Sequence, residues 1–404
     1  MKTNIQNVRG TQDFFNEQID RFNYVVNVFK KNVGTYNFHE IITPIIEFSN
    51  LFERSVGDDS DIIMKELYKF EDRGGNLLAL RPEFTAGVVR SFLSNGELNQ
   101  NLPQKLFSYG PIFRYDRPQK GRYRQFNQLN CEYIGNPEYL ADVEILLLGY
   151  NFLQDLKLKN ITLEINSLGS NECKKRYEIA LKEYFEKLKD KLSEDSKIRL
   201  EKNPLRILDS KDEGDKELLK EAPVISDFYS DKEKEFYSNI LKALDKFGIK
   251  YFSNNRLVRG LDYYTSTVFE FTTTDLGAQS AVLAGGRYDD LIKQMGGDSI
   301  PAVGFGSGLE RLMLLISDDL LTKDEITAVI PVSENENEFC LKLVDNLRKE
   351  GKRVEFIYSG KFKKKMEKMN KCGANFAIIV GEEEVKSGKL KIKDLSTGLE
   401  SYIQ

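Results

Sequence analysis

The chain has 404 residues, a length that indicates two or three domains with ample core. Hydrophobic residues make up 40% and charged residues 30% of it, as in an ordinary globular protein. The formal net charge of -4 excludes attraction of nucleic acid by bulk charge, so any RNA contact requires local basic patches.

Cysteine usage and the apolar runs indicate the compartment. The cysteines lie far apart and form no Cys-x-x-Cys pair, which argues against a zinc site and against a disulfide framework. The first residues resemble neither a signal peptide nor a transit peptide, and no apolar run reaches membrane-spanning length. We therefore expect a cytoplasmic protein that does not contact a membrane.

The single histidine, His39, narrows the chemistry. Catalysis built on a histidine base, or on several histidine ligands, is excluded. We expect no metal site made of protein side chains alone. His39 itself precedes an apolar run, where a structural role at the start of a strand is more common than a catalytic one.

The first half of the chain alternates helical and extended patterns. Apolar spacing from residue 17 to 33 predicts a helix that is capped at Gly34. Residues 41–46 predict a strand that Pro44 confines to a sheet edge or an irregular pairing. Further apolar runs predict a hairpin of two strands and then a helix, at residues 105–114, 122–134 and 141–155.

The second half predicts an insertion and a separate domain. From about residue 170 to 250, Lys and Glu dominate with helical periodicity, as in a helical insertion between two parts of one catalytic sheet. Strand patterns return at residues 259–273 and 281–284. From residue 323 onward, strands and helices alternate, which indicates a small α/β domain with a mainly parallel core. We expect strands at residues 327–332, 353–358 and 376–380 and helices at residues 339–347 and 361–371.

The segment Arg259-Gly260-Leu261-Asp262-Tyr263-Tyr264 combines a fixed cation, a carboxylate and two phenols. A guanidinium suits a small carboxylate ligand, and a phenol donates to or accepts from a neutral heteroaromatic ring. The run that follows Tyr263 is also rich in strand formers, so a purely structural interpretation stays open.

Glu83 and Thr85 lie two residues apart. On an extended segment such side chains face the same side, so both can bind one ammonium group. A helix start with Thr85 as its cap is the alternative, since Pro82 comes just before.

Residues 113–128 hold a cluster of arginines together with Lys120. Arginine forks match phosphate oxygens bidentately, and Phe126 offers a flat face on which a base can stack. Arg114 directly follows an apolar strand, where a merely solvated charge is less plausible. On the return strand Gln128 and Glu132 are four residues apart, so we expect both to face the same cavity.

Residues 301–308 form a glycine-rich strand that leads into a helix beginning near Leu309. The alternating glycines let backbone and ligand approach closely, and Arg311 in the first helical turn can meet a terminal phosphate. A tight turn from strand to helix explains the same glycines without any ligand.

Together these segments resemble the class II histidyl-tRNA synthetases along the whole chain. Val8–Asp13 resembles the opening of that family, and three further segments resemble the motifs that define class II, at residues 38–47, 113–132 and 301–312. Residues 259–270 and 283–289 resemble signatures particular to the histidyl family.

The resemblance implies an α+β fold. Residues 1–322 would form an antiparallel-sheet catalytic domain with the helical insertion, and residues 323–404 an α/β anticodon-binding domain. Two copies would form a homodimer through the first motif. The implied activity is ATP-dependent conversion of L-histidine to histidyl-adenylate, followed by transfer to the 3′ end of tRNA(His). Mg²⁺ would bridge the phosphates of ATP.

The resemblance also implies roles for single residues. The histidine-binding set would be Glu83, Thr85, Gln128, Glu132, Arg259, Tyr263 and Tyr264. Within it, Glu83, Thr85 and Gln128 would hold the ammonium, and Glu132 and Tyr264 would read the imidazole nitrogens. Arg259 and Arg114 would be catalytic and would contact the α-phosphate from two sides.

Other residues of the family pattern would bind ATP and tRNA. Arg114, Arg122, Phe126 and Arg311 would bind ATP, with Phe126 stacking on adenine and Arg311 holding the γ-phosphate. Arg117 and Gln119 would contact the tRNA acceptor end. Three positions depart from the pattern: Asn127 and Tyr115 stand where histidine is common, and Ser266, where glycine is usual, would narrow the pocket slightly.

Two alternatives use the same motifs. A synthetase-like regulatory subunit of ATP phosphoribosyltransferase would lack the anticodon domain and parts of residues 259–270. Another class II synthetase would lack the Tyr263-Tyr264 pair, and a threonyl enzyme would need zinc ligands. A basic helix over residues 361–371 offers either a tRNA surface or a solubilising face, through Lys361, Lys363, Lys364, Lys365, Lys368 and Lys371.

Overall fold

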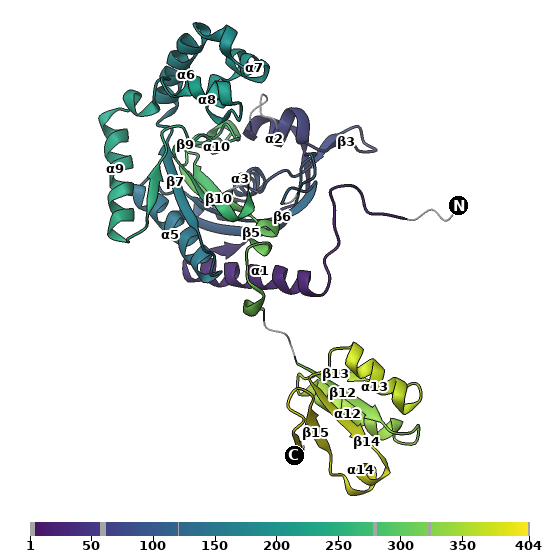
Figure 1. Cartoon of the computed structure of the whole chain (residues 1–404). Coiled ribbons are helices and arrows are strands. Elements are labelled where there is room, and N and C mark those ends of the chain that lie inside the picture. Colours follow the sequence, from purple (N-terminus) through teal and green to yellow (C-terminus); the bar gives the residue numbers. More distant parts are fainter. Residues whose placement is uncertain (1–4, 57–61, 120, 278–280, 322–324, 403–404) are drawn as a thin grey trace. The chain divides into compact units, whose positions relative to one another are not determined.

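The computed structural model describes residues 5–56, 62–119, 121–277, 281–321 and 325–402. The chain forms two compact units, Met1–Asp318 and Asp319–Gln404 (Figure 1). The boundary predicted between residues 322 and 323 lies outside the described residues. None of the helices in the described part of the chain combines the length and apolarity that a membrane crossing requires.

A large, mainly antiparallel sheet forms the centre of the first unit, as predicted. Only its two outermost pairs, β1 with β5 and β7 with β8, are parallel. In spatial order the strands are β1 (His39–Glu40), β5 (Gln104–Phe113), β6 (Gln125–Ile134), β11 (Ala302–Gly308), β10 (Ala281–Arg287), β9 (Thr265–Thr273), β7 (Ile161–Ser167) and β8 (Tyr251–Ser253).

Helices α1 (Glu17–Thr35) and α5 (Tyr139–Asp155) contact each other and pack on this sheet. Both were predicted, but α1 continues through Gly34, and the backbone turns only at Asn37, which has a φ of 60°. The predicted cap at Gly34 is therefore wrong. The hairpin of β5 and β6 is confirmed, with ten paired residues on each strand.

A second, small sheet lies between α1 and β5 in the sequence. Its strands are β2 (Ile46–Phe48), β4 (Leu77–Leu80) and β3 (Lys69–Glu71), in that spatial order. The helical segments around it are α2 (Ser49–Val56), a π-helix at Ile62–Glu66, α3 (Thr85–Ser94) and α4 (Gly96–Gln100).

The strand predicted at residues 41–46 is not continuous, and the irregular pairing expected at Pro44 is confirmed. Regular strands lie at His39–Glu40, on the edge of the large sheet, and at Ile46–Phe48. Backbone hydrogen bonds continue for one residue beyond each strand, from the N–H of Ile41 to the carbonyl of Phe107 and from the N–H of Arg81 to the carbonyl of Ile45, both at 2.9 Å. Between the two strands Pro44 has no N–H to donate, and the carbonyl of Thr43 accepts from the guanidinium of Arg81 at 2.9 Å. A side chain therefore replaces the missing ladder hydrogen bonds.

The helical insertion between β7 and β8 is confirmed. Its main helices are α6 (Asn171–Glu186), α7 (Glu194–Lys202), α8 (Glu213–Leu219) and α9 (Asp231–Lys246), with 3₁₀ turns at Lys189–Lys191, Pro204–Asp209 and Ile225–Phe228. The buried carboxylate of Asp215 accepts hydrogen bonds from three serine hydroxyls and so ties these segments together, at Ser193, Ser196 and Ser210. Two short helices complete the unit, α10 (Leu291–Gln294) and α11 (Leu309–Met313).

The second unit contains a five-stranded sheet. Its predicted parallel core is confirmed: β13 (Arg353–Phe356), β12 (Ile326–Pro331) and β14 (Phe376–Val380) run parallel. The antiparallel strands β15 (Lys391–Asp394) and β16 (Glu400–Tyr402) extend it and were not predicted. Its helices are α12 (Asn337–Lys349), α13 (Phe362–Lys371) and α14 (Glu382–Ser387).

Helix α13 is the predicted basic helix, but one of its lysines points inward. Lys365 is 2% exposed, and its ammonium donates to the carbonyl of Pro331 at 2.9 Å. Lys365 therefore belongs to the core of the second unit and cannot form part of a basic outer face. The other lysines of the predicted set are exposed, namely Lys361, Lys363, Lys364, Lys368 and Lys371.

Candidate active site

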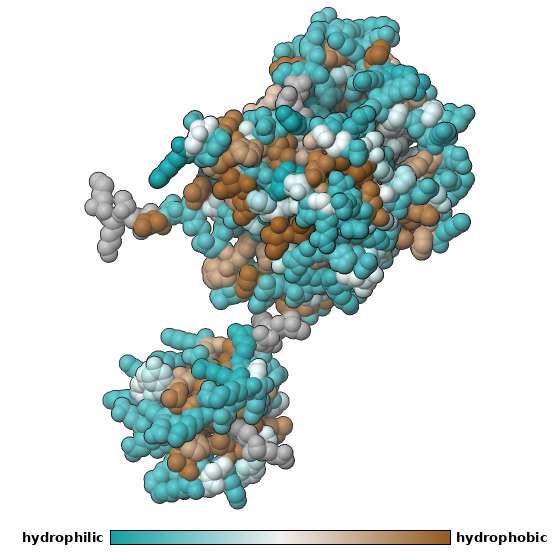
Figure 2. Space-filling model, turned by 180° about the vertical axis from the view of Figure 1, so that it is seen from behind, coloured by the Kyte–Doolittle hydropathy of each residue, from teal (hydrophilic) through white to brown (hydrophobic). Residues whose placement is uncertain are grey.

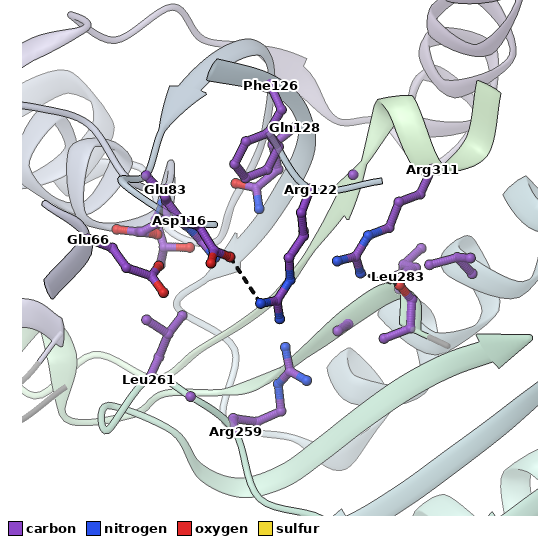
Figure 3. Close-up of a pocket in the computed structure, with 18 of the residues that line it drawn as sticks. Glu66, Glu83, Asp116, Arg122, Phe126, Gln128, Arg259, Leu261, Leu283 and Arg311 are labelled. Atoms are coloured by element: carbon purple, nitrogen blue, oxygen red, sulfur yellow. Dashed lines mark hydrogen bonds and ion pairs between the residues drawn. The ribbon is translucent and has the colours of Figure 1, made fainter. Parts of the chain in front are cut away.

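A cavity of about 360 Å³ lies over β6, β10 and β11 (Figure 3). Segments far apart in the sequence line it, including residues 121–123 before β6 and residues 258–261 before β9. Every residue predicted to bind histidine or ATP lines this cavity, with the exception of Glu132. These residues are Glu83, Thr85, Arg114, Arg122, Phe126, Gln128, Arg259, Tyr263, Tyr264 and Arg311.

One end of the cavity is cationic. The guanidinium groups of Arg122, Arg259 and Arg311 point into the same space in Figure 3, and Arg114 lines it too. Burial lowers the pKa of Arg311, and the nearby charges of Arg122 and Arg114 lower it further. Folding thus holds like charges together at a cost, an arrangement that suits a ligand with several negative charges.

Backbone carbonyls fix these arginines. Arg311 donates to the carbonyls of Gly121 at 3.2 Å and Ala281 at 2.7 Å. Arg114 donates from Nε to the carbonyl of Pro82 at 2.9 Å. Arg122 pairs with the carboxylate of Asp116 at 3.1 Å. Carbonyl partners orient a guanidinium without neutralising its charge. The charges of Glu66 and Glu83 act on Arg114, so acidic groups lie near that arginine as well.

The opposite end contains Glu83 and Thr85. Thr85 is the first residue of α3, so these two residues do not share an extended segment, and that expectation is wrong. The Glu83 carboxylate accepts from the backbone N–H groups of Thr85 at 2.6 Å and Ala86 at 2.7 Å, and so caps the helix. The alternative of a helix start is therefore confirmed, with Glu83 in place of Thr85 as the capping side chain, and both residues line the cavity.

Glu132 lies one layer beneath the lining and is 1% exposed. Its carboxylate accepts from the hydroxyl of Thr85 at 2.5 Å, from Nδ2 of Asn130 at 3.0 Å and from the hydroxyl of Tyr288. Burial raises the pKa of Glu132 to about 7. Gln128 and Glu132 were expected to face the same cavity, but only Gln128 lines it.

Tyr288 and Asn130 are two site residues that the sequence did not single out. The Tyr288 ring packs edge-on against Tyr263 at 5.6 Å between centroids, and its hydroxyl reaches Glu132. Asn130 lines the cavity from the same face of β6 as Gln128. Asn130 could have been predicted, because it lies midway between Gln128 and Glu132 and alternate residues of a strand face the same side.

Glycines of two neighbouring strands make room for these side chains. Gly304 of β11 stands opposite Glu132, and a Cβ there would overlap the Glu132 carboxylate. A Cβ at Gly306 would come within 2.8 Å of the Gln128 amide, and one at Gly286 within 2.9 Å of the Tyr264 ring. The glycines therefore admit neighbouring side chains as well as a ligand, a purpose that the sequence pattern alone did not show.

The segment with Arg259 and Tyr264 is a turn that precedes β9, so the strand predicted from residue 259 begins too early. Nη1 of Arg259 forms an ion pair with Glu270, while its Nε is buried without a hydrogen-bond partner. Burial raises the pKa of Tyr264 to about 12, and the nearby Arg259 charge opposes that shift. Tyr264 is therefore a neutral phenol near pH 7.

The helical insertion fastens this turn. Arg206 pairs with the carboxylate of Asp262 at 2.9 Å, and Lys174 donates to the carbonyls of Asp262 at 3.0 Å and Tyr264 at 3.3 Å. Three insertion residues that were not predicted to belong to the site also line the cavity: Arg199, Arg206 and Asp209.

The remaining predicted positions lie around the cavity. Arg117 and Gln119 are exposed on the loop between β5 and β6 and do not line it, and Lys120 lies outside the described residues. Asn127 replaces the expected histidine and donates to the carboxylate of Glu310 at 2.9 Å. Ser266 does not line the cavity, so the expected narrowing is wrong. Its φ of 46° lies in the left-handed region that favours glycine.

Comparison with known proteins identifies the class and family. Residues 10–312 match the sequence profile described as Histidyl-tRNA synthetase, and residues 327–403 match an anticodon binding domain. The histidine–tRNA ligase of Rickettsia bellii is 47% identical, with 100% of this chain and 97% of the relative aligned. That of Wolbachia pipientis subsp. Culex pipiens is 46% identical, with 98% and 97% aligned.

Solved structures agree. The crystal structure of apo histidyl-tRNA synthetase from S. aureus has a TM-score of 0.83 and 33% identity, covering 99% of this chain and 97% of that one. A Bacillus halodurans structure described as ATP phosphoribosyltransferase regulatory subunit/histidyl-tRNA synthetase shares the fold, at 21% identity and a TM-score of 0.68 over 94% of this chain and 99% of that one. The fold and cavity thus define an aminoacyl-tRNA synthetase. Within that class, the chain belongs to the histidyl-tRNA synthetase family.

The space at Gly304 gives a stability prediction. Gly304→Ala should lower the free energy of unfolding by about 1–3 kcal/mol, because the added methyl overpacks the contact with Glu132. Urea unfolding measures the change. Gly308→Ala on the same strand is the matched control, since its Cβ would meet nothing nearer than Arg311 Cδ at 3.7 Å. Equal losses in the two variants would contradict the overlap argument.

The buried acid gives a pH prediction. The pKa of Glu132 is raised from 4.5 to about 7, so its ionisation disfavours the folded state as pH rises through that window. Gln at this position does not titrate. The free energy of unfolding of Glu132→Gln, measured relative to that of the wild type, should therefore rise by about 2 kcal/mol from pH 5 to pH 8.

Unfolding midpoints of both proteins at the two pH values test this prediction. Glu217→Gln on the exposed surface of α8 controls for pH effects elsewhere in the chain. A constant difference between Glu132→Gln and wild type across the range would show that Glu132 is ionised at little cost.

Proposed function

We propose that this chain activates L-histidine with ATP, forming histidyl-adenylate and pyrophosphate, and transfers the histidyl group to the 3′ end of tRNA(His). One observation carries the proposal. A single cavity has a cationic end with several arginines and an opposite end with acid, hydroxyl, amide and phenol groups. An amino acid and a nucleoside triphosphate need those two environments side by side.

Two substitution steps account for the activity. The histidine carboxylate attacks the α-phosphorus of ATP, and pyrophosphate leaves. A terminal ribose hydroxyl of tRNA then attacks the carbonyl of the adenylate, and AMP leaves. Neither step needs a protein nucleophile. Positioning and neutralisation of phosphate charge supply the rate enhancement.

Acidic and polar groups serve the amino-acid end. Glu83, Thr85 and Gln128 hold the ammonium; the Glu83 carboxylate has lone pairs left for it, because a carboxylate offers about four acceptor positions and two N–H groups occupy it. Tyr264, a neutral phenol in the lining, and Glu132, a buried acid beneath it, select the imidazole. Tyr263 packs against Tyr264 at 4.7 Å between centroids and closes the wall.

Arginines serve the nucleotide end. Arg259 and Arg114 contact the α-phosphate, Arg311 holds the γ-phosphate, and Arg122 contributes to ATP binding. Phe126 stacks on adenine. The ring is open to the cavity, although Arg114 Cζ lies 5.7 Å from its centroid.

Mg²⁺ would arrive with ATP rather than occupy a site made of protein side chains alone. Within the described ranges, no group of three or more His, Cys, Asp or Glu side chains is arranged to hold a metal ion. Glu310 is the carboxylate beside Arg311 in the cavity lining, and Asn127 already occupies part of it. It would hold a phosphate-bound Mg²⁺ at one position only, where the ion's chemistry is neutralisation of phosphate charge.

Each of the two units contacts a different part of the tRNA. Residues 1–322 form the catalytic domain, where the exposed Arg117 and Gln119 meet the acceptor end. Residues 323–404 form the anticodon-binding domain, supported by the profile match at residues 327–403. That match favours the synthetase over a regulatory subunit of ATP phosphoribosyltransferase. We place the enzyme in the cytoplasm, in keeping with its free cysteine thiols.

A homodimer is supported by the burial pattern of strand β2 at the first motif, where the acidic residue is buried and the apolar residues are exposed. In β2 the acid Glu47 is buried and pairs with Arg90 at 2.7 Å, while Ile46 and Phe48 are about half exposed. Ile42 is 89% exposed just before it. Apolar surface also gathers on the face of the first unit shown in Figure 2. Exposed apolar patches of this kind mark protein interfaces.

Pyrophosphate exchange across the twenty amino acids tests the activity. Exchange should be strong with histidine alone. Arg259→Ala should reduce it at least about 100-fold, the scale of losing one donor to developing charge. Arg73→Ala, an exposed arginine in the turn between β3 and β4, is the control. Histidine-independent exchange would refute the substrate, and wild-type exchange in Arg259→Ala would refute the role of Arg259.

Sedimentation tests the dimer. Phe48→Glu should convert a dimer to monomers, because a carboxylate would be buried without a partner at the interface. Ile179→Glu on α6, where the isoleucine is 60% exposed, should remain dimeric. A monomeric wild type, or a dimeric Phe48→Glu, would count against this interface.

A further inference from the structure

Glu270 contacts Arg259 from outside the main cavity. It lies on β9, and its carboxylate pairs with Nη1 of Arg259. Both side chains are about one-fifth exposed, at 21% and 19%. An ion pair this sheltered from water restricts geometry more than a surface pair does.

A second, smaller polar cavity lies behind this pair. Arg259 lines both cavities, whereas Glu270 lines only the second, together with Glu164, Asp209 and Asn254. The Arg259 guanidinium therefore lies in the wall between the two spaces. In Figure 3 it points into the main cavity, toward Arg122.

The two partners differ in rigidity. Arg259 sits in a turn, on a long side chain with many accessible rotamers. Glu270 sits inside the sheet, paired with Ala284 of β10 on one side and Glu164 of β7 on the other. The strand therefore fixes the carboxylate, and the carboxylate can fix the arginine.

The other guanidinium contacts show what remains for a ligand. Glu270 holds Nη1, and Nε is buried without a hydrogen-bond partner. A buried N–H left unpaired costs free energy, and a bound oxyanion can remove that cost. One edge of Arg259 is thus anchored to the protein, and another has hydrogen-bonding capacity to spare.

We propose that Glu270 is a positioning residue for the activation step, a role that rests on the proposed function. It holds Arg259 by Nη1, so that the rest of the guanidinium meets the histidine carboxylate and the α-phosphate in one orientation. Without Glu270 the arginine keeps its charge but spreads over several rotamers. Misplacement of a catalytic group by about 1 Å can cost about 100-fold in rate.

Glu164 provides a matched control. It is the cross-strand partner of Glu270 and lines the same second cavity. Its carboxylate accepts from Nδ2 of Asn254 at 2.8 Å, whereas Glu270 pairs with Arg259. Loss of charge at Glu164 therefore tests the effect of removing a carboxylate from that cavity without touching Arg259.

Kinetics provide the first test. Glu270→Gln keeps the shape and loses the charge, and it should lower kcat for histidine-dependent pyrophosphate exchange about 10- to 100-fold. KM for ATP and the thermal midpoint should stay near wild type, and Glu164→Gln should match wild type. If Glu270→Gln is too unstable to assay, Glu270→Asp serves, with a smaller loss expected because the charge is retained on a shorter stem.

A double-mutant cycle on ligand binding distinguishes a positioning role of Glu270 from a general contribution to the stability of the fold. The probe is a sulfamoyl analogue of histidyl-adenylate, measured by calorimetry on the full chain. Glu270→Gln should weaken binding about tenfold when Arg259 is present and leave it unchanged in Arg259→Ala, because coupled residues do not add. Equal weakening in both backgrounds, or no weakening in either, would overturn the role of Glu270.

Failure of the proposed function gives a different result. If the wild type neither binds the probe nor exchanges pyrophosphate with histidine, the activity itself is refuted and the positioning role with it. If the wild type does both and Glu270→Gln equals it, only the positioning role is refuted.

Discussion

The buried carboxylate of Glu132 is the interaction around which the site is organised. It accepts hydrogen bonds from the start of α3, from its own strand and from the end of β10, through Thr85, Asn130 and Tyr288. These segments are far apart in sequence, and a charged acid beneath a cavity is stable only when such donors converge on it. Gly304 supplies the space. Removing any one of these contacts leaves a buried acid short of partners.

The cationic half of the cavity follows from the same sheet. Arg114 directly follows β5, and Arg311 lies in the first turn of the helix after β11. Antiparallel pairing of β5, β6 and β11 places those ends together, and backbone carbonyls then aim the guanidinium groups. The result is an environment that changes from acidic and neutral to strongly basic within one small volume. Such a gradient orients a ligand whose own charge is unequally distributed.

Strong periodic patterns predicted most of the fold. The hairpin, α5, the helical insertion and the parallel core of the second unit were all visible in apolar spacing. Errors arose where side chains replace backbone pairing, as at Thr43 with Arg81, or where a helix runs through a glycine, as at Gly34. Neither effect leaves a periodic trace in the sequence.

The candidate site was predictable to the extent that its residues carry motifs. The sequence does not show how deeply a side chain is buried. Glu132 was therefore expected in the cavity lining, although it lies beneath that lining. The insertion residues Arg199 and Arg206 were missed because long-range packing, and no local spacing, brings them to the cavity. Tyr288 was missed for the same reason, since long-range packing brings its hydroxyl to Glu132. Burial and tertiary contact had to be observed.

The attachment of the helical insertion to the turn that carries Arg259 has a practical consequence for protein engineering. Lys174 and Arg206 both hold that turn from the insertion, through Asp262 and Tyr264. A minimal synthetase made by excising residues 171–246 would therefore lose both of these contacts to the turn that carries Arg259. Miniaturisation of this enzyme has to replace those supports before it can shorten the chain.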